Sequence, residues 1–422
     1  MKILTAIVLA VTFSVDSTPP DSISLQYCYD RVAETYPTAK KVELQRKITA
    51  LNARIANTGY YPQVDVGAKA TYQSEVTEFG LPGSANVPSV SKDQYEASIN
   101  VMQNIFSGGA VGIRKELEHT KGMQNIHETE IEMHQIRSQL NQVYFGILLS
   151  KQQQEVNSLL IENLREQLSS VEAKVKSGVL LPSQQNILKA ELIKAQQDSA
   201  TVQSTIRASY RVLGELINEE VTPSTPLTLP EPTVSYQSLQ PKRAEYELFE
   251  TTRKALEQRK ELAETEKLPK VSAFGTVAYG RPGYNFLNDD FHEYYMVGIQ
   301  LQWSLLDFLN SDREMQALKI EQKKVRQNEK AFNRQLNARL DRIEERLSTI
   351  RENIKGDKRI IALRKEVVRE SASKLKNGTI TATEYVTELN QANKAQLSLF
   401  LNRVKLSEAH IEYATVLGVP LN

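Results

Sequence analysis

The sequence has 422 residues, of which 40% are hydrophobic and 24% charged, and its 52 basic and 51 acidic residues leave a net charge of +1. A charge so near zero gives no general attraction for nucleic acid or an anionic membrane surface. The single cysteine excludes an internal disulfide framework and a cysteine-based zinc site. After the N-terminus, no apolar stretch is long enough for a transmembrane helix.

Residues 1–17 are predicted to be a secretory signal peptide. Lys2 supplies the positive start, and the apolar run that follows ends at Asp16. The alternative is a disordered or buried N-terminal helix. No A-x-A triplet precedes Asp16, so the cleavage site is not assigned. Cys28 is expected to be a small buried hydrophobe on a helix face.

The remaining chain is predicted to contain two structural repeats. The motif Gly-Tyr-Tyr-Pro-Gln-Val at Gly59 is similar to Glu-Lys-Leu-Pro-Lys-Val at Glu266, and lone glycines at Gly178 and Gly378 are 200 residues apart. Such matching suggests an ancient duplication. The predicted segments are a first repeat at 18–218, a Pro-rich linker at 219–240 and a second repeat at 241–422.

Within each repeat, the pattern predicts a helix, two strands joined by a loop, and two long helices joined by a turn. The first repeat is predicted to have strands at about 63–72 and 95–105, with long helices at about 109–176 and 183–218. The second is predicted to have strands at about 271–280 and 294–304, with long helices at about 311–376 and 382–417.

The strands alternate between apolar and polar residues with a period of two. Segments of about ten residues with one apolar face suit an outer-membrane barrel strand, although an ordinary half-buried sheet has the same alternation. The predicted lipid-facing residues are Val64, Val66, Ala68, Ile99, Val101, Val297, Ile299 and Leu301. Aromatic residues near the strand ends favour an interfacial girdle, namely Tyr60, Tyr61, Tyr95, Tyr294, Tyr295 and Trp303.

The long helices carry seams that are typical of coiled coils. Apolar residues recur with a heptad spacing from Leu336 to Leu375. Gly178 and Gly378 stand where each long helix must reverse, and a glycine in the left-handed conformation does so with least steric cost. Pro182 is expected at the first position of the helix that follows. The last helix of each repeat is expected to end at a Leu-Gly pair, Leu213-Gly214 in the first and Leu417-Gly418 in the second. Matching strands of the two repeats are expected to end at Phe106 and Leu306.

With these motifs in order, the chain resembles the TolC-like outer-membrane efflux proteins over nearly its whole mature length. Asn104-Ile105-Phe106-Ser107-Gly108-Gly109, the tips Val175-Lys176-Ser177-Gly178 and Leu375-Lys376-Asn377-Gly378, and the final Leu417-Gly418 carry the match. The resemblance implies a mainly α fold with a small β part: each copy of a homotrimer gives four strands to a twelve-stranded outer-membrane barrel, continued by a periplasmic α-helical tunnel. The implied partners are outer-membrane lipid, a periplasmic adaptor (membrane fusion protein) and an inner-membrane pump.

The resemblance places the functional site at the helix tips, at the end facing the inner membrane. The predicted adaptor-docking residues are Val175, Gly178, Val179, Leu180, Leu181, Pro182, Leu375, Gly378 and Thr379. Glu384 and Gln184 are expected to line the aperture. Many family members have aspartate at these two positions. Here only Glu384 is charged, so one carboxylate ring would line the aperture instead of two. This difference puts the family's cation gating in doubt for this chain.

No phosphate-binding loop, dinucleotide fingerprint or catalytic constellation occurs, so no enzyme activity, cofactor, metal site or nucleic-acid partner is expected. His119, His127 and His134 with Glu130 could share a helix face, although a solvated coiled-coil face explains them better. The sequence predicts an outer-membrane duct of a tripartite efflux or type I secretion system in a Gram-negative cell. The alternative is a periplasmic coiled-coil structural or adaptor-type protein without its own pore. The cargo is not specified by the sequence.

Overall fold

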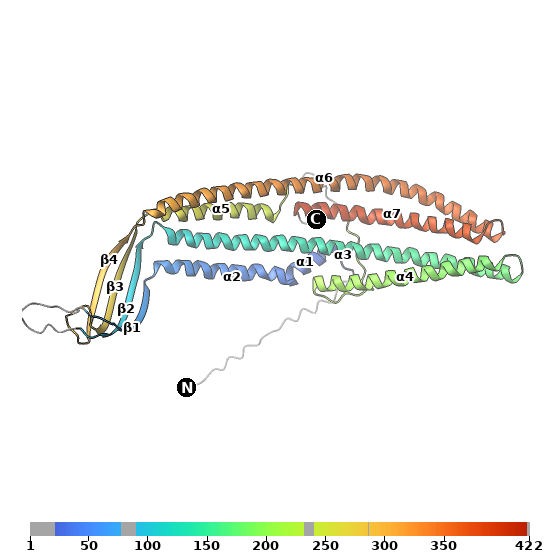
Figure 1. Ribbon diagram of the computed structural model, residues 1–422. Coiled ribbons are helices and arrows are strands. Elements are labelled where there is room, and N and C mark those ends of the chain that lie inside the picture. Colours follow the sequence, from blue (N-terminus) through green and yellow to red (C-terminus); the bar gives the residue numbers. More distant parts are fainter. Residues whose placement is uncertain (1–21, 77–89, 232–239, 286, 420–422) are drawn as a thin grey trace, which may run out of the picture. The chain divides into compact units, whose positions relative to one another are not determined.

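The computed structural model describes residues 22–76, 90–231, 240–285 and 287–419. The described chain is mostly helical with one four-stranded antiparallel sheet (Figure 1), which confirms the predicted mainly α fold with a small β part. The predicted signal peptide lies outside the described residues. Within the described ranges, no helix combines the length and hydrophobicity needed to cross a lipid bilayer.

The elements, in chain order, are α1 (Leu25–Thr35), α2 (Pro37–Asn57), the short 3-10 helix η1 (Thr58–Tyr60), β1 (Gln63–Tyr72), β2 (Asp93–Phe106), α3 (Ala110–Lys176), α4 (Pro182–Ile217), α5 (Ala244–Thr265), β3 (Lys270–Arg281), β4 (His292–Gln302), α6 (Leu306–Lys376) and α7 (Ala382–Leu417).

The contacts between residues divide the chain into two compact units that differ from the predicted sequence repeats. The first unit comprises Met1–Ala39, Met133–Lys242 and Leu336–Asn422, and the second comprises Lys40–Glu132 and Arg243–Gln335. Each unit therefore contains parts of both predicted repeats.

The second unit contains the sheet, whose strands follow the order β1-β2-β3-β4 (Figure 1). Val66 of β1 is opposite Ile99 of β2, and Ile99 is opposite Val277 of β3. Val277 is in turn opposite Tyr295 of β4. Because side chains alternate along a strand, this register places the apolar positions of all four strands on one face.

Four helical segments of the second unit contact one another in the order α2, α3, α5, α6. A Cβ atom added at Gly122 of α3 would lie 2.1 Å from Oγ1 of Thr49, so α2 approaches α3 closely there. Gln124 of α3 donates a 3.0 Å hydrogen bond to Oγ1 of Thr252 in α5. Arg253 of α5 pairs with Glu329 of α6 at 2.5 Å.

The first unit has a hydrophobic core built from α1, α3, α4 and α7 around two fully buried tyrosines, Tyr144 and Tyr210. The Tyr144 hydroxyl lies 2.9 Å from the carbonyl oxygen of Ile23 and 2.6 Å from that of Thr228, which fastens the segment after α4 to the core. Cys28 is fully buried on α1, as predicted. Burial raises the pKa of its thiol to about 12.

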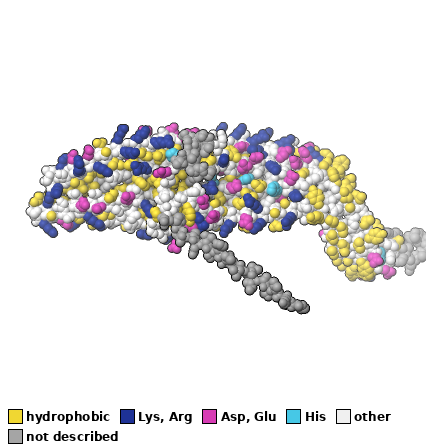
Figure 2. Space-filling view, turned by 180° about the vertical axis from the view of Figure 1, so that it is seen from behind, with side chains coloured by type: hydrophobic (Ala, Val, Ile, Leu, Met, Phe, Trp, Pro, Cys, Tyr) yellow, Lys and Arg dark blue, Asp and Glu magenta, His cyan; other side chains and the backbone are white. Residues whose placement is uncertain are grey.

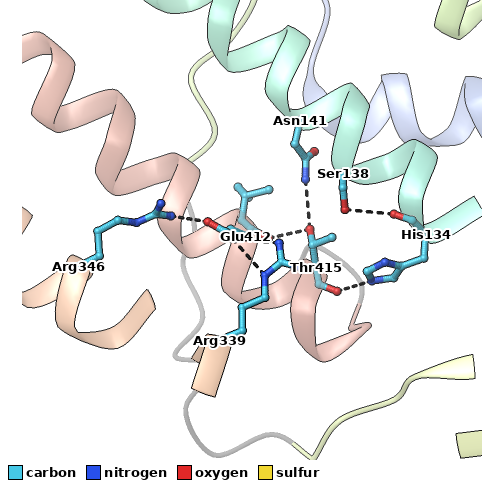
Figure 3. Close-up of polar contacts among 8 residues, drawn as sticks. His134, Ser138, Asn141, Arg339, Arg346, Glu412 and Thr415 are labelled. Atoms are coloured by element: carbon cyan, nitrogen blue, oxygen red, sulfur yellow. Dashed lines mark hydrogen bonds and ion pairs between the residues drawn. The ribbon is translucent and has the colours of Figure 1, made fainter. Parts of the chain in front are cut away.

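The C-terminal end of α7 is fixed to α3 and α6 by polar contacts (Figure 3). Glu412 accepts from Arg339 at 3.1 Å and pairs with Arg346. About one turn further along α7, the Asn141 amide donates to Oγ1 of Thr415 at 3.2 Å, and the His134 ring contacts the Thr415 carbonyl oxygen. These contacts join α3 and α6 to the C-terminal end of α7 within the first unit.

Two element ends differ from the prediction. β4 stops at Gln302 and α6 begins at Leu306, so Leu306 starts a helix instead of ending a strand; Asp307 in the first turn complements the positive end of the helix dipole. Gly214 lies inside α4, which ends at Ile217 with Asn218 in the left-handed conformation. A Cβ atom at Gly214 would lie 2.6 Å from the carbonyl oxygen of Glu219, which explains a glycine there.

Candidate functional site

The two helix reversals in the first unit have the same backbone geometry. Gly178 and Gly378 both have φ of +72°, as predicted for glycines that end long helices. The N–H of Val179 donates to the carbonyl oxygen of Lys174 at 2.8 Å, and the N–H of Thr379 donates to that of Lys374 at 3.0 Å. Pro182 is the first residue of α4, also as predicted. The two turns are therefore structural equivalents.

A shared apolar cluster joins the two reversals. The buried members of this tip cluster are Leu164, Val171, Leu188, Ala195, Leu375, Ala382, Tyr385, Val386 and Leu389. Polar contacts add to it, because the N–H of Ala382 donates to Oε1 of Gln184 at 2.8 Å and the Asn390 amide donates to Glu191 at 3.0 Å. The Lys174 ammonium also contacts the carbonyl oxygen of Lys376. The α3–α4 and α6–α7 hairpins thus end as one packed body.

The predicted docking residues separate into outward and inward side chains. Val179 and Leu181 are 66% and 67% exposed, whereas Leu180 between them packs against the tip cluster. Val175 also packs against the cluster, and Leu375 belongs to its buried core. The glycines, Pro182 and Thr379 are exposed. Of the predicted apolar docking residues, Val179, Leu181 and Pro182 have exposed side chains, whereas Val175, Leu180 and Leu375 pack inward.

The two residues predicted to line the aperture have structural partners. Glu384 forms a capping box with Thr381 at the start of α7, in which the carboxylate accepts the Thr381 N–H at 2.7 Å. The backbone hydrogen bond, followed by the bond from the Thr381 hydroxyl, lowers the pKa of Glu384. Gln184 is half-buried and accepts the Ala382 N–H. Sequence reasoning missed both contacts, although Thr-x-x-Glu before a helix is a capping-box signature.

A second candidate surface is the apolar face of the sheet in the other unit. Val64, Val66, Val297, Ile299 and Leu301 are between 60% and 79% exposed, and Ile99 is 46% exposed. Ala68 is exposed and Val101 is half-buried. Figure 2 shows hydrophobic side chains gathered over the sheet, whereas charged side chains are spread over the helices. Nothing in the described chain covers this face. Exposing so many apolar side chains to water is energetically unfavourable.

The opposite face of the sheet carries hydrogen-bonded polar groups together with Met102, Phe274 and Met296. The Thr276 hydroxyl donates to Oδ1 of Asn100 at 2.8 Å, and the Tyr294 hydroxyl donates to Glu96 at 2.9 Å. Tyr294 therefore belongs to this face, which contradicts its predicted place in the same girdle as Tyr295. The period of two explains the error, because neighbouring residues of a strand point to opposite faces.

One exposed apolar stripe was missed by the sequence analysis. Leu44, Ile48, Leu51 and Ile55 follow one another along α2 and are between 47% and 65% exposed. Their spacing of four, three and four residues is the heptad signal that was recognised elsewhere in the chain. Within the described residues, this face of α2 has no partner helix.

The histidine cluster considered in the sequence does not assemble. His127 contacts Glu130 at 3.0 Å, and the His134 ring contacts Thr415. No group of three or more potential ligands among the described residues could hold a metal ion.

No protein-family model and no curated protein matches this sequence, but solved structures match its fold. The outer membrane protein VceC of Vibrio cholerae has a TM-score of 0.73 at 13% identity, with 94% of this chain and 97% of that chain covered. The CmeC outer membrane channel of Campylobacter jejuni has a TM-score of 0.74 at 11% identity, with 99% and 93% covered. This chain has the fold of bacterial outer-membrane channels.

The fold therefore confirms the predicted resemblance to the TolC-like outer-membrane proteins. The MtrE outer membrane channel of Neisseria gonorrhoeae in its open state also matches, with a TM-score of 0.64 at 14% identity and 94% and 89% of the two chains covered. At this low sequence identity, the channel structures show the fold of this chain.

Proposed function

We propose that this protein is the outer-membrane duct of an export system, assembled from three copies whose sheets close a twelve-stranded barrel. The observation that carries the proposal is the aligned apolar face of four strands. In the described chain, β1 and β4 each have one unpaired edge. Four strands cannot close a barrel, and an open edge in lipid leaves backbone groups without partners. Pairing of β1 with β4 of the next copy removes both edges.

The helices extend the same assembly. The exposed stripe on α2, the helix that precedes η1 and the edge strand β1, would pack against a neighbouring copy in the trimer. The twelve long helical segments of three copies would continue the barrel as a periplasmic tunnel. Export would be passive, because no nucleotide-binding motif occurs in the sequence.

Energy would be supplied by an inner-membrane pump through a periplasmic adaptor that docks on the tips. The exposed side chains of Val179 and Leu181 support this part of the proposal, since apolar side chains at a tip are a liability unless a partner covers them. Glu384, which is fixed at the start of α7, would form a threefold carboxylate ring if the tips of three copies meet. Such a ring favours cations.

The assembly is tested by membrane fractionation and native mass measurement of the protein extracted from its host. The expected result is an outer-membrane trimer. A folded monomer in the periplasmic fraction would instead support the coiled-coil structural or adaptor-type function without a pore, and would refute the duct.

Docking is tested with Val179→Asp/Leu181→Asp and the matched control Leu180→Asp, using crosslinking to the adaptor and export assays. The double variant is expected to remain a trimer and to lose adaptor crosslinking and export. Leu180→Asp is expected to lower the melting temperature, because Leu180 packs against the tip cluster. Full export by the double variant would show that the tip is not the docking surface.

A further inference from the structure

The two helix reversals of the first unit carry a local excess of positive charge. The last turns of α3 and α6 contain the same pair of lysines, namely Lys174, Lys176, Lys374 and Lys376. Residues 174–185 and 374–385 together contain these four lysines and one acidic residue, Glu384. Four minus one gives a local charge of +3, although the whole chain has a net charge of only +1.

The two reversals lie side by side, so their charges belong to one surface (Figure 1). Leu180 of the first turn is next to Gly378 of the second, since a Cβ atom added at Gly378 would lie 3.8 Å from Cδ2 of Leu180. The Lys174 ammonium contacts the carbonyl oxygen of Lys376. The lysines at the ends of α3 and α6 are therefore held close to one another.

Most of this positive charge is not neutralised within the described chain. Lys176, Lys374 and Lys376 are exposed. Among the residues that the structure describes, neither Lys176 nor Lys376 forms an ion pair through its side chain. Lys374 lies 3.8 Å from Glu370, and both side chains of this pair are exposed. An exposed pair of this kind contributes little, so Lys374 also remains available to a partner.

Two carboxylates in this region are already held by other groups. Glu172 on α3 pairs with Lys189 at 3.1 Å and accepts from the Gln185 amide at 2.8 Å. Glu384 accepts the Thr381 N–H at 2.7 Å in its capping box. Neither carboxylate forms an ion pair with the lysines at the two reversals in the described chain.

A structural role explains only part of this charge. A lysine in the last turn complements the negative end of the helix dipole, and Lys174 also contacts a carbonyl oxygen at the end of α6. Lys176 and Lys376 come two residues after the first lysine of each pair. Four like charges at one surface repel one another, and acidic groups of a partner would relieve that repulsion.

Apolar side chains accompany the lysines. Val179 and Leu181, which are 66% and 67% exposed, follow Lys176 in the first turn. An apolar centre with a charged, solvent-accessible rim is the usual anatomy of a protein–protein interface. Binding to a lipid surface requires a broad apolar helix face, whereas here two side chains project from a turn. A protein partner therefore fits this surface better than a membrane.

We propose that the basic tip surface, formed by Lys176, Val179, Leu181, Lys374 and Lys376, docks an acidic segment of a partner protein. Aspartate or glutamate side chains of the partner would face the lysines, and an apolar residue would cover Val179 and Leu181. This inference rests on the proposed function, in which the tips are the docking surface, and adds the charge of the partner. Complementary charge at a rim raises the association rate and selects among partners.

The first test uses the full-length protein in its host, with a photo-crosslinking amino acid in place of the exposed Ser177. Lys176→Gln/Lys376→Gln is expected to lower the yield of protein crosslinks at least about threefold, because exposed charge pairs with the partner are lost. Lys176→Arg/Lys376→Arg keeps the charge and should keep the yield. The matched control Lys323→Gln/Lys324→Gln alters two exposed lysines of α6 outside the tips and should change nothing.

Sequencing the crosslinked peptide by mass spectrometry gives the chemistry of the partner. A contacting segment rich in aspartate or glutamate is expected. A neutral or basic segment overturns the proposal, as do equal yields for the wild type and Lys176→Gln/Lys376→Gln. Crosslinks to phospholipid alone would assign the lysines to a membrane and also overturn it. No crosslink in any background contradicts the proposed docking site itself, whereas a crosslink that ignores charge contradicts only the acidic partner.

The second test measures association of the purified trimer with the crosslinked partner at two salt concentrations. Between about 50 and about 300 mM NaCl, the association rate of the wild type is expected to fall about tenfold, because salt screens exposed charges. The rate of Lys176→Gln/Lys376→Gln is expected to fall only about twofold to threefold. Equal salt dependence of the two proteins overturns the proposal.

Discussion

The backbone N–H of Ala382 donates a 2.8 Å hydrogen bond to Oε1 of Gln184. The first N–H groups of a helix have no partner within that helix. Here the partner comes from the first turn of α4, in the other hairpin, and Ala382 itself is fully buried. The start of α7 is consequently capped twice, by Thr381 of its own chain segment and by Gln184 across the tip.

Gln184→Leu is expected to free the Ala382 N–H and destabilise the joint between the tips by about 1 kcal/mol, the net value of a typical hydrogen bond. Amide hydrogen exchange over residues 382–385 should accelerate about fivefold. The matched control is Gln185→Leu, whose native amide bonds Glu172 within its own hairpin at 2.8 Å. Equal exchange in both variants would show that the contact with Ala382 contributes nothing.

Gly122→Ala and Gly146→Ala are expected to change stability in opposite directions, although both glycines lie in α3. A Cβ atom at position 122 would lie 2.1 Å from Thr49 Oγ1, so α2 must move and about 1–3 kcal/mol is lost. At position 146, no atom outside the local backbone of α3 lies within 4 Å of an added Cβ, so alanine should gain about 0.5–1 kcal/mol of helix propensity. Melting followed by circular dichroism measures both. A stabilising Gly122→Ala would mean that α2 does not contact α3 there.

The tip turns show how far local sequence rules reach. Gly178, Gly378 and Pro182 were predicted in their observed conformations because helix reversal depends on backbone sterics within a few residues. The heptad seam was predicted in part. Five of its nine positions are buried, namely Leu336, Ile343, Leu347, Ile350 and Leu375. The other four are half-buried, namely Leu340, Ile354, Ile361 and Val368. The spacing of apolar residues indicates which side of a helix packs against another helix.

Contacts between distant segments could not be predicted in the same way. Gln184 and Ala382 are 198 residues apart, and no local pattern brings them together. The close approach of α2 to α3 depends on the small size of Gly122, and its effect is seen only once both helices are placed. Leu180 was assigned to docking because it is apolar and near a turn. The inward direction of its side chain depends on the three-dimensional packing of the tip cluster.

Val66→Arg tests the face that the proposed barrel turns to lipid. Val66 is 79% exposed in the single chain, and a charge near the bilayer midplane costs about 2–4 kcal/mol. We expect less trimer in the outer membrane and a lower unfolding free energy in urea. The adjacent Asp65→Arg places the same side chain on the polar face and should be tolerated. Similar losses for both variants would show that the faces are assigned wrongly.

Glu408→Gln is expected to stabilise the first unit at neutral pH. Desolvation by burial raises the pKa of Glu408 and the nearby Glu412 carboxylate raises it further, while Arg346 and Lys405 oppose them. A carboxyl group with a raised pKa in the folded state binds more protons when folded. Its contribution to stability is therefore present below its ordinary value of about 4.5 and is lost as the pH rises through the folded pKa.

The melting temperature of Glu408→Gln should therefore exceed that of the wild type at pH 7, and the difference should shrink toward pH 4. Glu412→Gln is the matched control one turn later in α7, because Glu412 pairs with Arg339 at 3.1 Å and with Arg346 (Figure 3). Losing these pairs should destabilise the unit by about 1 kcal/mol at pH 7. A Glu408→Gln variant that melts below the wild type at pH 7 would show that Arg346 outweighs the desolvation of Glu408.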